Sequence, residues 1–567
     1  MADVVRLNTF IGAGVDLTGV KPSGYVGPIS ALEHYAALEG GSLSGNPNVS
    51  FVQLSDAPGS FSEHYLFDFY NRIWLSPDYV DFGTINVNES QTFSVWNAYF
   101  VPKLLTSVTP PLDTSVTTSV VGGTNLAALE LRDYSVTAFA SGPAKLDASF
   151  IFNFSGANSV TLTVGGSRAE VWPFRPDFAS PWRVSYEFKT EVITSRSGVE
   201  QRRALRIRPR KTIEFKATTK GDSFIDLKRM LTRWQNGRFI VPEINRKITV
   251  TSDIASGTSI IPVSEVPFWA VAGRDVIIQR PINPYKWQQS VHGIQSVNVG
   301  AKTITITNAT DFAWTAGTAV HPALLCLMEP ETTLASVTST VGEINVRFSV
   351  DPTYEPNPVN PGAFTSFDGR EVFTKSPNWS SNPSTDFIYP YEQVDFGRGA
   401  IQTIRPILFS TQSRRMTFLS RTSADAEGML AQFMRAKGQR GEFFTDSGEP
   451  DIIPSVPTPA GNNIIRVAGR DVFDTYANDT VHKALLFKMV DGTNHYTKVQ
   501  SIALDGSDSV ITVVSSLGQT VSSSTIVRIS WVRLSRYATD SLTFDWITES
   551  VAQTQLTLRT LEYNAVE

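Results

Sequence analysis

The chain has 567 residues, a formal net charge of −5 and charged side chains at 18% of its positions. A chain of this length forms several domains, about three or four at ordinary domain sizes. The small net charge excludes a strong basic field that would attract nucleic acid or an anionic membrane surface, so we expect protein partners. Sparse charge with many Gly, Pro, Thr, Ser, Val and Phe residues is typical of strands and turns, and it predicts an all-β fold with a few helices.

The single cysteine, Cys326, lies in an apolar run and excludes both an intrachain disulfide and a paired-cysteine metal site. We interpret it as a buried strand residue. The first residues lack the charged and apolar segments of a secretory signal, and no apolar run reaches the roughly 18 residues that a membrane helix needs. We therefore expect a protein that acts in water and contacts no membrane.

Residues 1–75 are rich in glycine and include one predicted short helix, Ser30 to Leu38. They could hardly form a core alone, so we interpret them as an arm that docks on partners. Residues 76–171 contain short strand-like runs with turn residues between them, such as Val80 to Ile85 and Thr92 to Asn97. This spacing predicts an immunoglobulin-like β-sandwich without its disulfide.

The rest of the chain contains one β-rich unit twice, at 172–352 and 373–567. The offset between the copies drifts slowly, from 201 at the predicted turn (399 − 198 = 201) to 204 after the predicted helix (443 − 239 = 204). Residues 353–372 lie between the copies and are crowded with Pro, Asn and Gly, which predicts a linker. The positions that define the repeat are Gly198 and Gly399, Gly237 and Gly441, and Phe239 and Phe443.

Each copy is expected to contain one helix between strands. The first helix is predicted from an N-cap near Asp222 to Gly237, and the second ends at Gly438 and Gly441. Alternating runs at Thr303 to Ile306 and at Val510 to Val513 predict strands beyond the helices. Each copy is therefore predicted to be a β-sandwich or barrel with one helix against it. The apolar faces are predicted at Phe224, Leu227, Leu231 and Trp234, and at Leu430, Phe433, Met434 and Lys437.

One hexapeptide, Val-Ala-Gly-Arg-Asp-Val, breaks this register because it occurs at 271–276 and again at 467–472 (467 − 271 = 196). Two interpretations are open. It is a shared turn displaced by eight extra residues in the first copy (204 − 196 = 8), with a compensating insertion later in the second copy, or its recurrence is a coincidence.

Two stretches carry resemblances to known families. The stretch VDFGTINVNESQTFSVWNAYF, 80–100, resembles the opening strands of immunoglobulin-like domains of the major-sperm-protein and Hydin type. Such domains bind protein and carry no catalytic residues. The upstream FYNRIWLSPDYVDFG, with the paired aromatic entries of the two copies, resembles tail-tip or baseplate proteins of long-tailed bacteriophages.

The phage resemblance implies that each copy is a tail-tube-like unit in a ring of six. Two copies per chain then imply a homotrimer, since 3 × 2 = 6, with a hexamer as the alternative. The implied partners are the tail tube, distal tail, hub and fibre proteins, in a virion tail tip assembled in the host cytoplasm. Neighbouring subunits would pair strand edges, so we predict that proline at Ile304 or Ile511 disrupts assembly or folding. The arm and the segment Asp351 to Gly369 are predicted to drape over neighbours.

The densest charge cluster is SRSGVEQRRALRIRPRK, where Arg206, Arg208 and Arg210 alternate with apolar residues. On a strand this spacing places three guanidinium groups on one face. We favour a solvated or intersubunit face, with Glu200 and Glu214 as ion-pair partners, over contact with an acidic ring or with DNA. The second copy has no such stripe, and stacking aromatics are absent, so no sequence-specific nucleic-acid binding is expected.

No pattern of catalytic, cofactor-binding or metal-binding residues occurs. The six histidines show no metal-binding spacing, and nucleophile-elbow, phosphate-loop and dinucleotide motifs are absent. We interpret the pairs Asp78 and Asp81, and Asp505 and Asp508, as turn residues. Two carboxylates brought together by the fold escape sequence analysis, so a glycosidase stays open in principle.

Three functions are therefore compared. A structural tail-tip protein is favoured, because the repeated features are turns, helix ends and core positions. An adhesin that binds a host glycan or protein through exposed aromatics is the alternative. A cell-wall-degrading enzyme on the tail is the least favoured.

Overall fold

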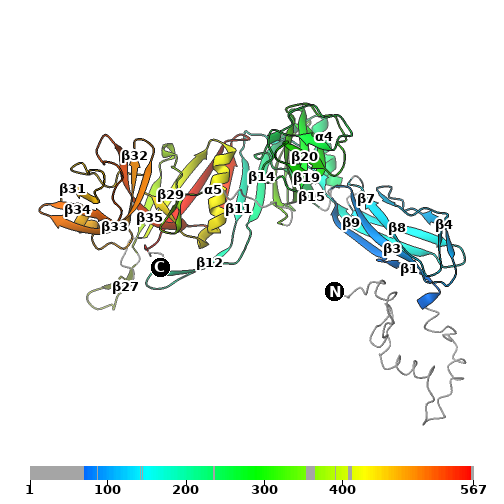
Figure 1. Cartoon of the computed structure of the whole chain (residues 1–567), viewed down its shortest axis with the longest axis horizontal. Coiled ribbons are helices and arrows are strands. Elements are labelled where there is room, and N and C mark those ends of the chain that lie inside the picture. The colour runs from blue at the N-terminus through cyan, green and yellow to red at the C-terminus, as the bar shows by residue number, and fades with distance from the viewer. Residues whose placement is uncertain are drawn as a thin grey trace, which may run out of the picture. The chain divides into compact units, whose positions relative to one another are not determined.

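The computed structural model describes residues 69–563 except for 86, 141, 143–144, 234–236, 353–363, 390 and 406–410. The chain divides into two compact units, Met1–Ala169 and Glu170–Glu567, and Figure 1 shows that strands dominate both. The predicted all-β class is confirmed. The predicted helix at Ser30 to Leu38 and most of the arm lie outside the described residues.

The first unit is a β-sandwich whose two sheets share one core. Phe93 of one sheet stacks on Phe152 of the other, with ring centroids 5.9 Å apart, and both side chains are buried. Residues 73–75 were predicted to belong to the arm, but they form a strand that pairs with the third strand of the sandwich. One sheet has the order β1 (Ile73–Ser76), β3 (Glu89–Asn97), β7 (Leu131–Ala138), β5 (Val116–Thr118), and the other β2 (Tyr79–Ile85), β9 (Val160–Arg168), β8 (Lys145–Phe154), β4 (Lys103–Thr109), β6 (Thr124–Leu126).

The second unit contains two halves, which we call repeat 1 and repeat 2. Repeat 1 consists of β10 (Glu170–Val171), β11 (Trp182–Glu187), β12 (Thr190–Thr194), β13 (Glu200–Ala204), β14 (Arg210–Lys220), α4 (Asp222–Arg233), β15 (Arg238–Pro242), β16 (Ile248–Thr249), β17 (Ile260–Pro262), β18 (Asp275–Asn283), β19 (Lys286–Asn298), β20 (Thr303–Ile306), β21 (Ala319–Met328), β22 (Leu334–Thr338) and β23 (Val341–Val350).

Repeat 2 begins inside the predicted linker. It consists of β24 (Ser366–Phe367), β25 (Arg370–Phe373), η2 (Trp379–Ser381), β26 (Ser384–Ile388), β27 (Glu392–Val394), β28 (Gln402–Ile404), β29 (Thr411–Ser420), α5 (Ser423–Ala436), η3 (Gly438–Arg440), β30 (Phe443–Asp446), β31 (Ile464–Val467), α6 (Asp471–Tyr476), β32 (Ala484–Met489), β33 (Asn494–Asp505), β34 (Asp508–Val513), β35 (Ile526–Tyr537), β36 (Ser541–Trp546) and β37 (Ala552–Thr560).

Strand pairing follows the same scheme in both repeats. A short strand runs parallel to the strand after the helix, as β10 with β15 and as β25 with β30. The long strand before the helix pairs with the last strand, as β14 with β23 and as β29 with β37. Between them, β17, β20, β19, β18 and β21 pair in series, and so do β31, β34, β33, β32 and β35. The duplication seen in the sequence is therefore also present in the topology.

A set of three aromatic rings occupies the same place in each repeat. In repeat 1, the ring of Trp172 lies 6.2 Å from Phe215 and 5.6 Å from Phe239. In repeat 2, Phe373 lies 5.2 Å from Phe418 and 6.2 Å from Phe443. The offsets are 201, 203 and 204 (373 − 172, 418 − 215, 443 − 239), and they follow the slow drift found in the sequence. Phe239 and Phe443 are equivalent core residues.

The two helices form where they were predicted, with differences in their buried faces. α4 begins at Asp222, although the carbonyl of Gly221 accepts the first helical hydrogen bonds, so Asp222 lies in the first turn and is not the N-cap. Its third core residue is Met230, not Leu231, and Trp234 lies outside the described residues. In α5, Thr422 is the N-cap, and Lys437 is the left-handed C-cap residue at the end of the predicted face.

The four glycines that define the repeat are required for different structural reasons. Gly198 and Gly399 have φ of 90° and 105° between the strands of their hairpins, a conformation that side chains disfavour. Gly237 has φ of 64° after α4. Gly441 has φ of −79°, but a Cβ there would lie 2.6 Å from the Ala436 backbone, so close approach requires glycine.

One prediction about a domain boundary and one about strand edges are wrong. The linker predicted at 353–372 includes β24 and β25, because Asp368 and Gly369 form a hairpin turn and Phe367 packs on Phe444 with centroids 5.2 Å apart. The strands of Ile304 and Ile511 are not free edges, since each is paired on both sides. Proline at either residue would therefore break the fold and would not report on assembly.

Candidate assembly interface

Repeat 1 and repeat 2 are joined by a pair of antiparallel strands. β11 pairs with β36 over six residues, from Trp182 opposite Trp546 to Glu187 opposite Ser541. One face of β11, formed by Trp182, Val184 and Tyr186, is buried. The joint therefore extends the sheet of repeat 1 into repeat 2 and covers the edge of β11, which lies beside α5 in Figure 1.

The hairpin β12–β13 leaves repeat 1 after this edge and is fixed to repeat 2. Glu200 accepts two hydrogen bonds from Arg536, Nε to Oε2 at 2.7 Å and Nη2 to Oε1 at 2.8 Å. Arg202 donates to Glu442 at 2.8 Å. Burial raises the pKa of Glu200, but the hydrogen bonds and charge of Arg536 outweigh it, so the net shift is downward. These charge-assisted contacts hold the hairpin as a strap across the joint.

Phe188 connects the strand pair to this hairpin. Its ring lies 5.5 Å from Phe433 of α5, and only 2% of its surface is exposed. Its backbone N–H donates to the Asp540 carbonyl at 2.9 Å, and the Thr190 N–H and hydroxyl donate to the Asp540 carboxylate. Helix α5 and the β35–β36 turn thus form the surface of repeat 2 on which the end of β11 packs.

Four charged side chains form a buried cluster beside the joint. Lys211 Nζ lies 2.9 Å from Glu243 Oε1, and Arg246 Nη1 lies 3.3 Å from Glu243 Oε2. Arg246 also donates to Glu427 of α5, Nε to Oε1 at 2.7 Å. The Lys211 and Glu243 side chains are fully buried. Desolvation raises the pKa of Glu243, but the charges of Arg246 and Lys211 outweigh it and lower the pKa overall. The cluster balances two cations with two carboxylates and links the repeats.

Above this cluster lies a cavity of about 560 Å³ between the repeats. Repeat 1 contributes Arg246, Lys247 and Phe268 to its walls, and α5 contributes Glu427 and Arg435. The cavity belongs to the joint, because both repeats are needed to form its walls.

We expect His321 of β21 to make the first repeat sensitive to acid. It is buried, and desolvation and the nearby Lys247 lower its pKa from 6.5 to about 3. Because the pKa of His321 is lower in the folded state, the unfolded state binds a proton more readily. The contribution of His321 to stability is therefore fully present above pH 6.5 and is lost as the pH falls toward 3. Between pH 7 and pH 5 we expect the wild type to lose about 2 kcal/mol more unfolding free energy than a His321→Gln variant. Denaturant titration at both pH values checks this, and an equal loss in both proteins would contradict it.

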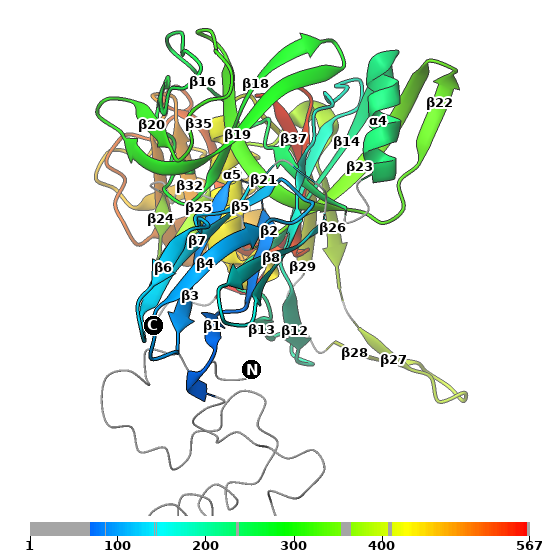
Figure 2. The same ribbon diagram turned by 90° about the vertical axis from the view of Figure 1, so that its right-hand side faces the viewer.

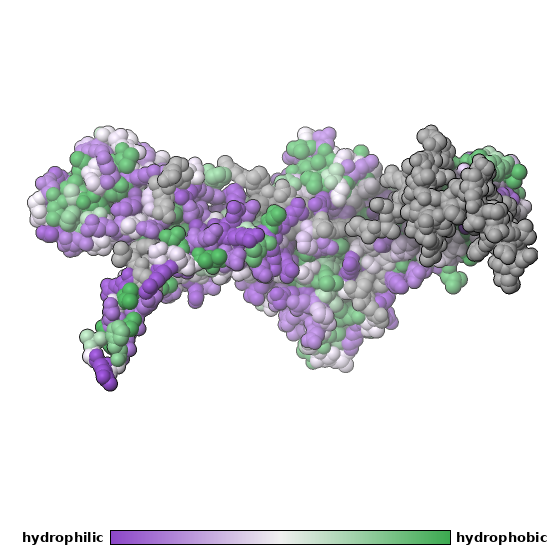
Figure 3. Space-filling view, turned by 90° about the horizontal axis from the view of Figure 1, so that it is seen from below, coloured by the Kyte–Doolittle hydropathy of each residue, from purple (hydrophilic) through white to green (hydrophobic). Residues whose placement is uncertain are grey.

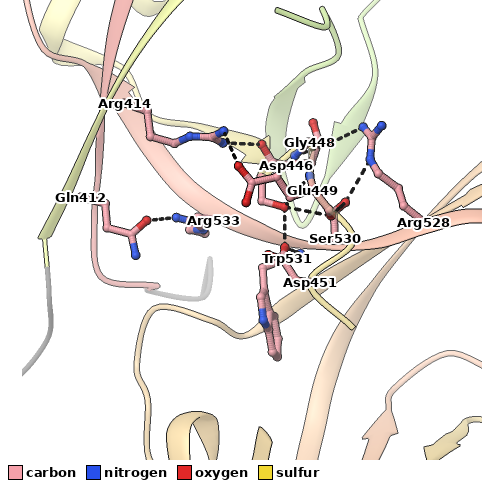
Figure 4. Close-up of polar contacts among 11 residues, drawn as sticks. Gln412, Arg414, Asp446, Gly448, Glu449, Asp451, Arg528, Ser530, Trp531 and Arg533 are labelled. Carbon is pink, nitrogen blue, oxygen red and sulfur yellow. Dashed lines mark hydrogen bonds and ion pairs between the residues drawn. The ribbon is translucent and has the colours of Figure 1, made fainter. Parts of the chain in front are cut away.

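Repeat 2 has a related polar cluster, shown in Figure 4. Arg414 occupies the position of Lys211, four residues before the equivalent phenylalanine (418 − 414 and 215 − 211), and donates to the Asp446 carbonyl at 3.3 Å. Asp451 accepts from the Trp531 N–H at 2.8 Å and from Ser447. These contacts hold the loop after β30 against β35. Four further contacts complete the cluster. Arg528 donates to the Asp446 carboxylate, Ser530 donates to the Glu449 carbonyl, Arg414 forms an ion pair with Glu449, and Arg533 donates to Gln412.

The clusters differ in what covers them. In repeat 1, Glu427 of α5 closes the cluster by pairing with Arg246. In repeat 2, the Glu449 side chain beside Arg414 is 58% exposed. Burial lowers the pKa of Arg533, and the nearby Arg414 lowers it further. The polar cluster of repeat 2 is therefore partly open to solvent at Glu449.

The predicted arginine stripe does not form a strand face. The segment 205–209 lies between β13 and β14, because the chain bends there. Arg206 donates to the Glu187 carbonyl at 3.2 Å, whereas Arg208 and Arg210 are exposed. The predicted partners are engaged elsewhere, Glu200 with Arg536 and Glu214 with Arg183. The role of these arginines as intersubunit contacts stays a prediction.

The buried charge cluster was not predicted, although the sequence contains a signal for it. Lys211 shares the buried face of β14 with Ile213, Phe215 and Ala217, so its alternation marks it as an inward residue. The turn interpretation is supported, since Asp81 accepts from the Gly83 N–H and since Asp505 and Asp508 face each other across the β33–β34 turn. Over residues 69–563, apart from the gaps, no group of three metal-ligating side chains forms and no helix is long and apolar enough to cross a membrane.

Comparison with known proteins gives no family. No protein-family model and no curated protein matches the chain. Among solved structures, one match is the secreted serine protease VesC from Vibrio cholerae, at 12% identity and a TM-score of 0.15. It covers 48% of this chain and 49% of that protein, about half its length. A TM-score this low carries no inference about fold or activity.

Proposed function

We propose that this protein is a structural component of a phage tail tip or baseplate. Its two repeats act as tail-tube-like units of a pseudo-six-fold ring that joins the tail tube to distal hub or fibre proteins. The observation that carries the proposal is the β11·β36 joint, in which one repeat docks edge to edge on a second repeat of the same topology. The joint uses different surfaces of the two repeats, and such heterologous contacts close into rings when the rotation permits.

The first unit is proposed to be an immunoglobulin-like domain that binds a protein partner. Support comes from its strand order, because β1-β3-β7-β5 matches an A-B-E-D sheet and β4-β8-β9 matches a C-F-G sheet. The opening strands β2 and β3 lie where the resemblance to the major-sperm-protein type begins. Arg206, Arg208 and Arg210 are proposed as intersubunit contacts near the strap. The proposal assigns the chain no catalytic step and no cofactor.

Native mass measurement and electron-microscope class averages of the full chain test this function. A homotrimer of about 187 kDa (3 × 62.3 kDa) with six similar lobes is expected; a hexamer with a ring would keep the function and change the stoichiometry. A chain that stays monomeric in the presence of tail components would contradict the proposal. Glycan binding by that monomer would support the alternative of an adhesin.

A further inference from the structure

The strand of repeat 2 that corresponds to β11 is β26. In repeat 1, Glu187 pairs with Arg210, five residues before Phe215. In repeat 2, Asp386 pairs with Ser413, five residues before the equivalent Phe418. The sequences agree with this register, since Ser-Tyr-Glu-Phe at 185–188 matches Ser-Thr-Asp-Phe at 384–387. Phe387 is therefore the counterpart of Phe188.

These two counterparts have opposite environments. β11 pairs with β14 on one side and β36 on the other, whereas in the described part of the chain β26 pairs only with β29. Phe188 is buried against α5, but Phe387 is 60% exposed, and its neighbours Ile388 and Tyr389 are exposed as well. An uncovered strand edge with apolar side chains is a ready site for pairing with another chain.

The counterpart of the receiving strand β36 is the segment 329–334 that leads into β22, since Leu334 pairs with Ile344 as Trp546 pairs with the equivalent Ala552. β36 follows β35, the partner of β30, just as β22 follows β21, the partner of β15. Both β36 and β22 form a hairpin with the last strand of their repeat. Within the described residues β22 pairs only with β23, and four of its five side chains are exposed. Figure 2 shows α4 beside this hairpin, as α5 lies beside β36, and Ile225 on α4 is exposed.

The hairpins that follow the two edge strands also differ. β12–β13 lies as a strap on repeat 2 through Glu200 and Arg202. Its counterpart β27–β28 stands out from the second unit, with apolar patches on it in Figure 3. Tyr391, Phe396 and Ile401 on this projection are exposed. β27–β28 also contacts the turn of β12–β13, where Arg196 pairs with Glu392. Within the described residues, repeat 2 thus presents an open β26 edge and a projecting hairpin, and repeat 1 presents the counterpart of the surface that receives them in the joint.

We propose that β26 of one copy pairs with the segment 329–334, at the start of β22, of a second copy and that the β11·β36 joint is thereby reproduced between chains. Phe387 then packs on α4 of the second copy, and β27–β28 lies across that copy's first repeat. The inference deepens the proposed function and rests on its claim that chains assemble through their repeats. Three chains joined in this way give six joints, alternately within and between chains.

Thiol cross-linking of the full chain tests the joint directly. Ser384→Cys on β26 and Glu331→Cys beside β22, the counterparts of Ser185 and Thr543 in the β11·β36 joint, are introduced together; the native Cys326 is buried and does not interfere. A short bis-maleimide is expected to give covalent dimers and trimers only when both cysteines are present. Multimers from Ser384→Cys alone would mean that like edges meet, which would overturn the head-to-tail joint.

A matched pair within one chain serves as the control. Ser185 and Thr543 are directly opposite in β11·β36, with hydroxyl oxygens 2.9 Å apart. The Ser185→Cys/Thr543→Cys variant is therefore expected to link within the chain and to add no multimers beyond those of the wild type. A link within the chain in this control shows that the reagent joins cysteines that lie opposite each other in two paired strands.

Substitution at the free edge gives a second readout. Phe387→Asp is expected to convert the assembly to monomers, whereas Val490→Asp, at a similarly exposed apolar residue in the β32–β33 turn, leaves the mass unchanged. Rings that persist in Phe387→Asp and never cross-link would overturn the joint while the proposed function stands. Cross-linked open filaments would support the joint and contradict the ring. A monomer with tail components present would overturn both.

Discussion

Glu243→Gln is expected to lower the free energy of unfolding by about 3–5 kcal/mol, because it leaves the buried cations Lys211 and Arg246 without their shared carboxylate. Denaturant titration near pH 7 measures the loss. The same variant should loosen the joint, since Arg246 also holds Glu427 of α5. Proteolysis between the repeats should therefore become faster in the variant.

A surface ion pair of the same repeat gives the control. Glu343 lies 2.8 Å from Lys216 with 36% of its side chain exposed, so Glu343→Gln is expected to cost less than about 1 kcal/mol. The pKa of Glu243 is lowered from its ordinary 4.5, which means that its contribution is present above pH 4.5 and is lost as pH falls through the folded-state value. Equal losses for the two variants at pH 7 would contradict the role of burial.

Phe239→Ala and Phe443→Ala are each expected to cost about 3–5 kcal/mol, because both remove a fully buried ring from the same place in the two repeats. The loss combines the missing apolar contacts with the cavity that remains. The shift of the denaturation midpoint of each repeat measures it. Phe312→Ala, at a phenylalanine that is 41% exposed, is the control and should shift the midpoint far less. A large cost at only one of the two buried sites would contradict their structural equivalence.

Short-range patterns predicted much of the fold. The start of α4 at Asp222, the glycine turns at Gly198 and Gly399 and the strands β20 and β34 all depend on residues close in the chain. Their signals are alternation, helical spacing and backbone freedom, which a single sequence displays. The wrong predictions lie where such signals are ambiguous. An Asp-Gly pair is typical of both a linker and a tight hairpin, and the turn at Asp368 is a hairpin.

The repeated hexapeptide shows the limit of local sequence. Gly273 and Gly469 both adopt positive φ, 79° and 82°, so the turn itself is shared. The following Asp275 then begins β18, whereas Asp471 begins α6. The interpretation of a displaced turn is favoured, since the extra residues of repeat 2 include α6, before β32. The same residues become strand or helix according to the neighbours available for pairing.

The sequence by itself determined the β-rich class, the duplication and the core positions shared by both repeats, because these depend on patterns within each copy. Only the tertiary structure decided that β11 pairs with β36, 364 residues away (546 − 182 = 364), and that β26 and β22 each pair on one side only within the described part of the chain. The reason is physical: strand pairing between distant segments depends on complementary surfaces that no local pattern encodes. The same holds for Lys211, whose charge is tolerated in the interior only because Glu243 and Arg246 with Glu427 complete the cluster.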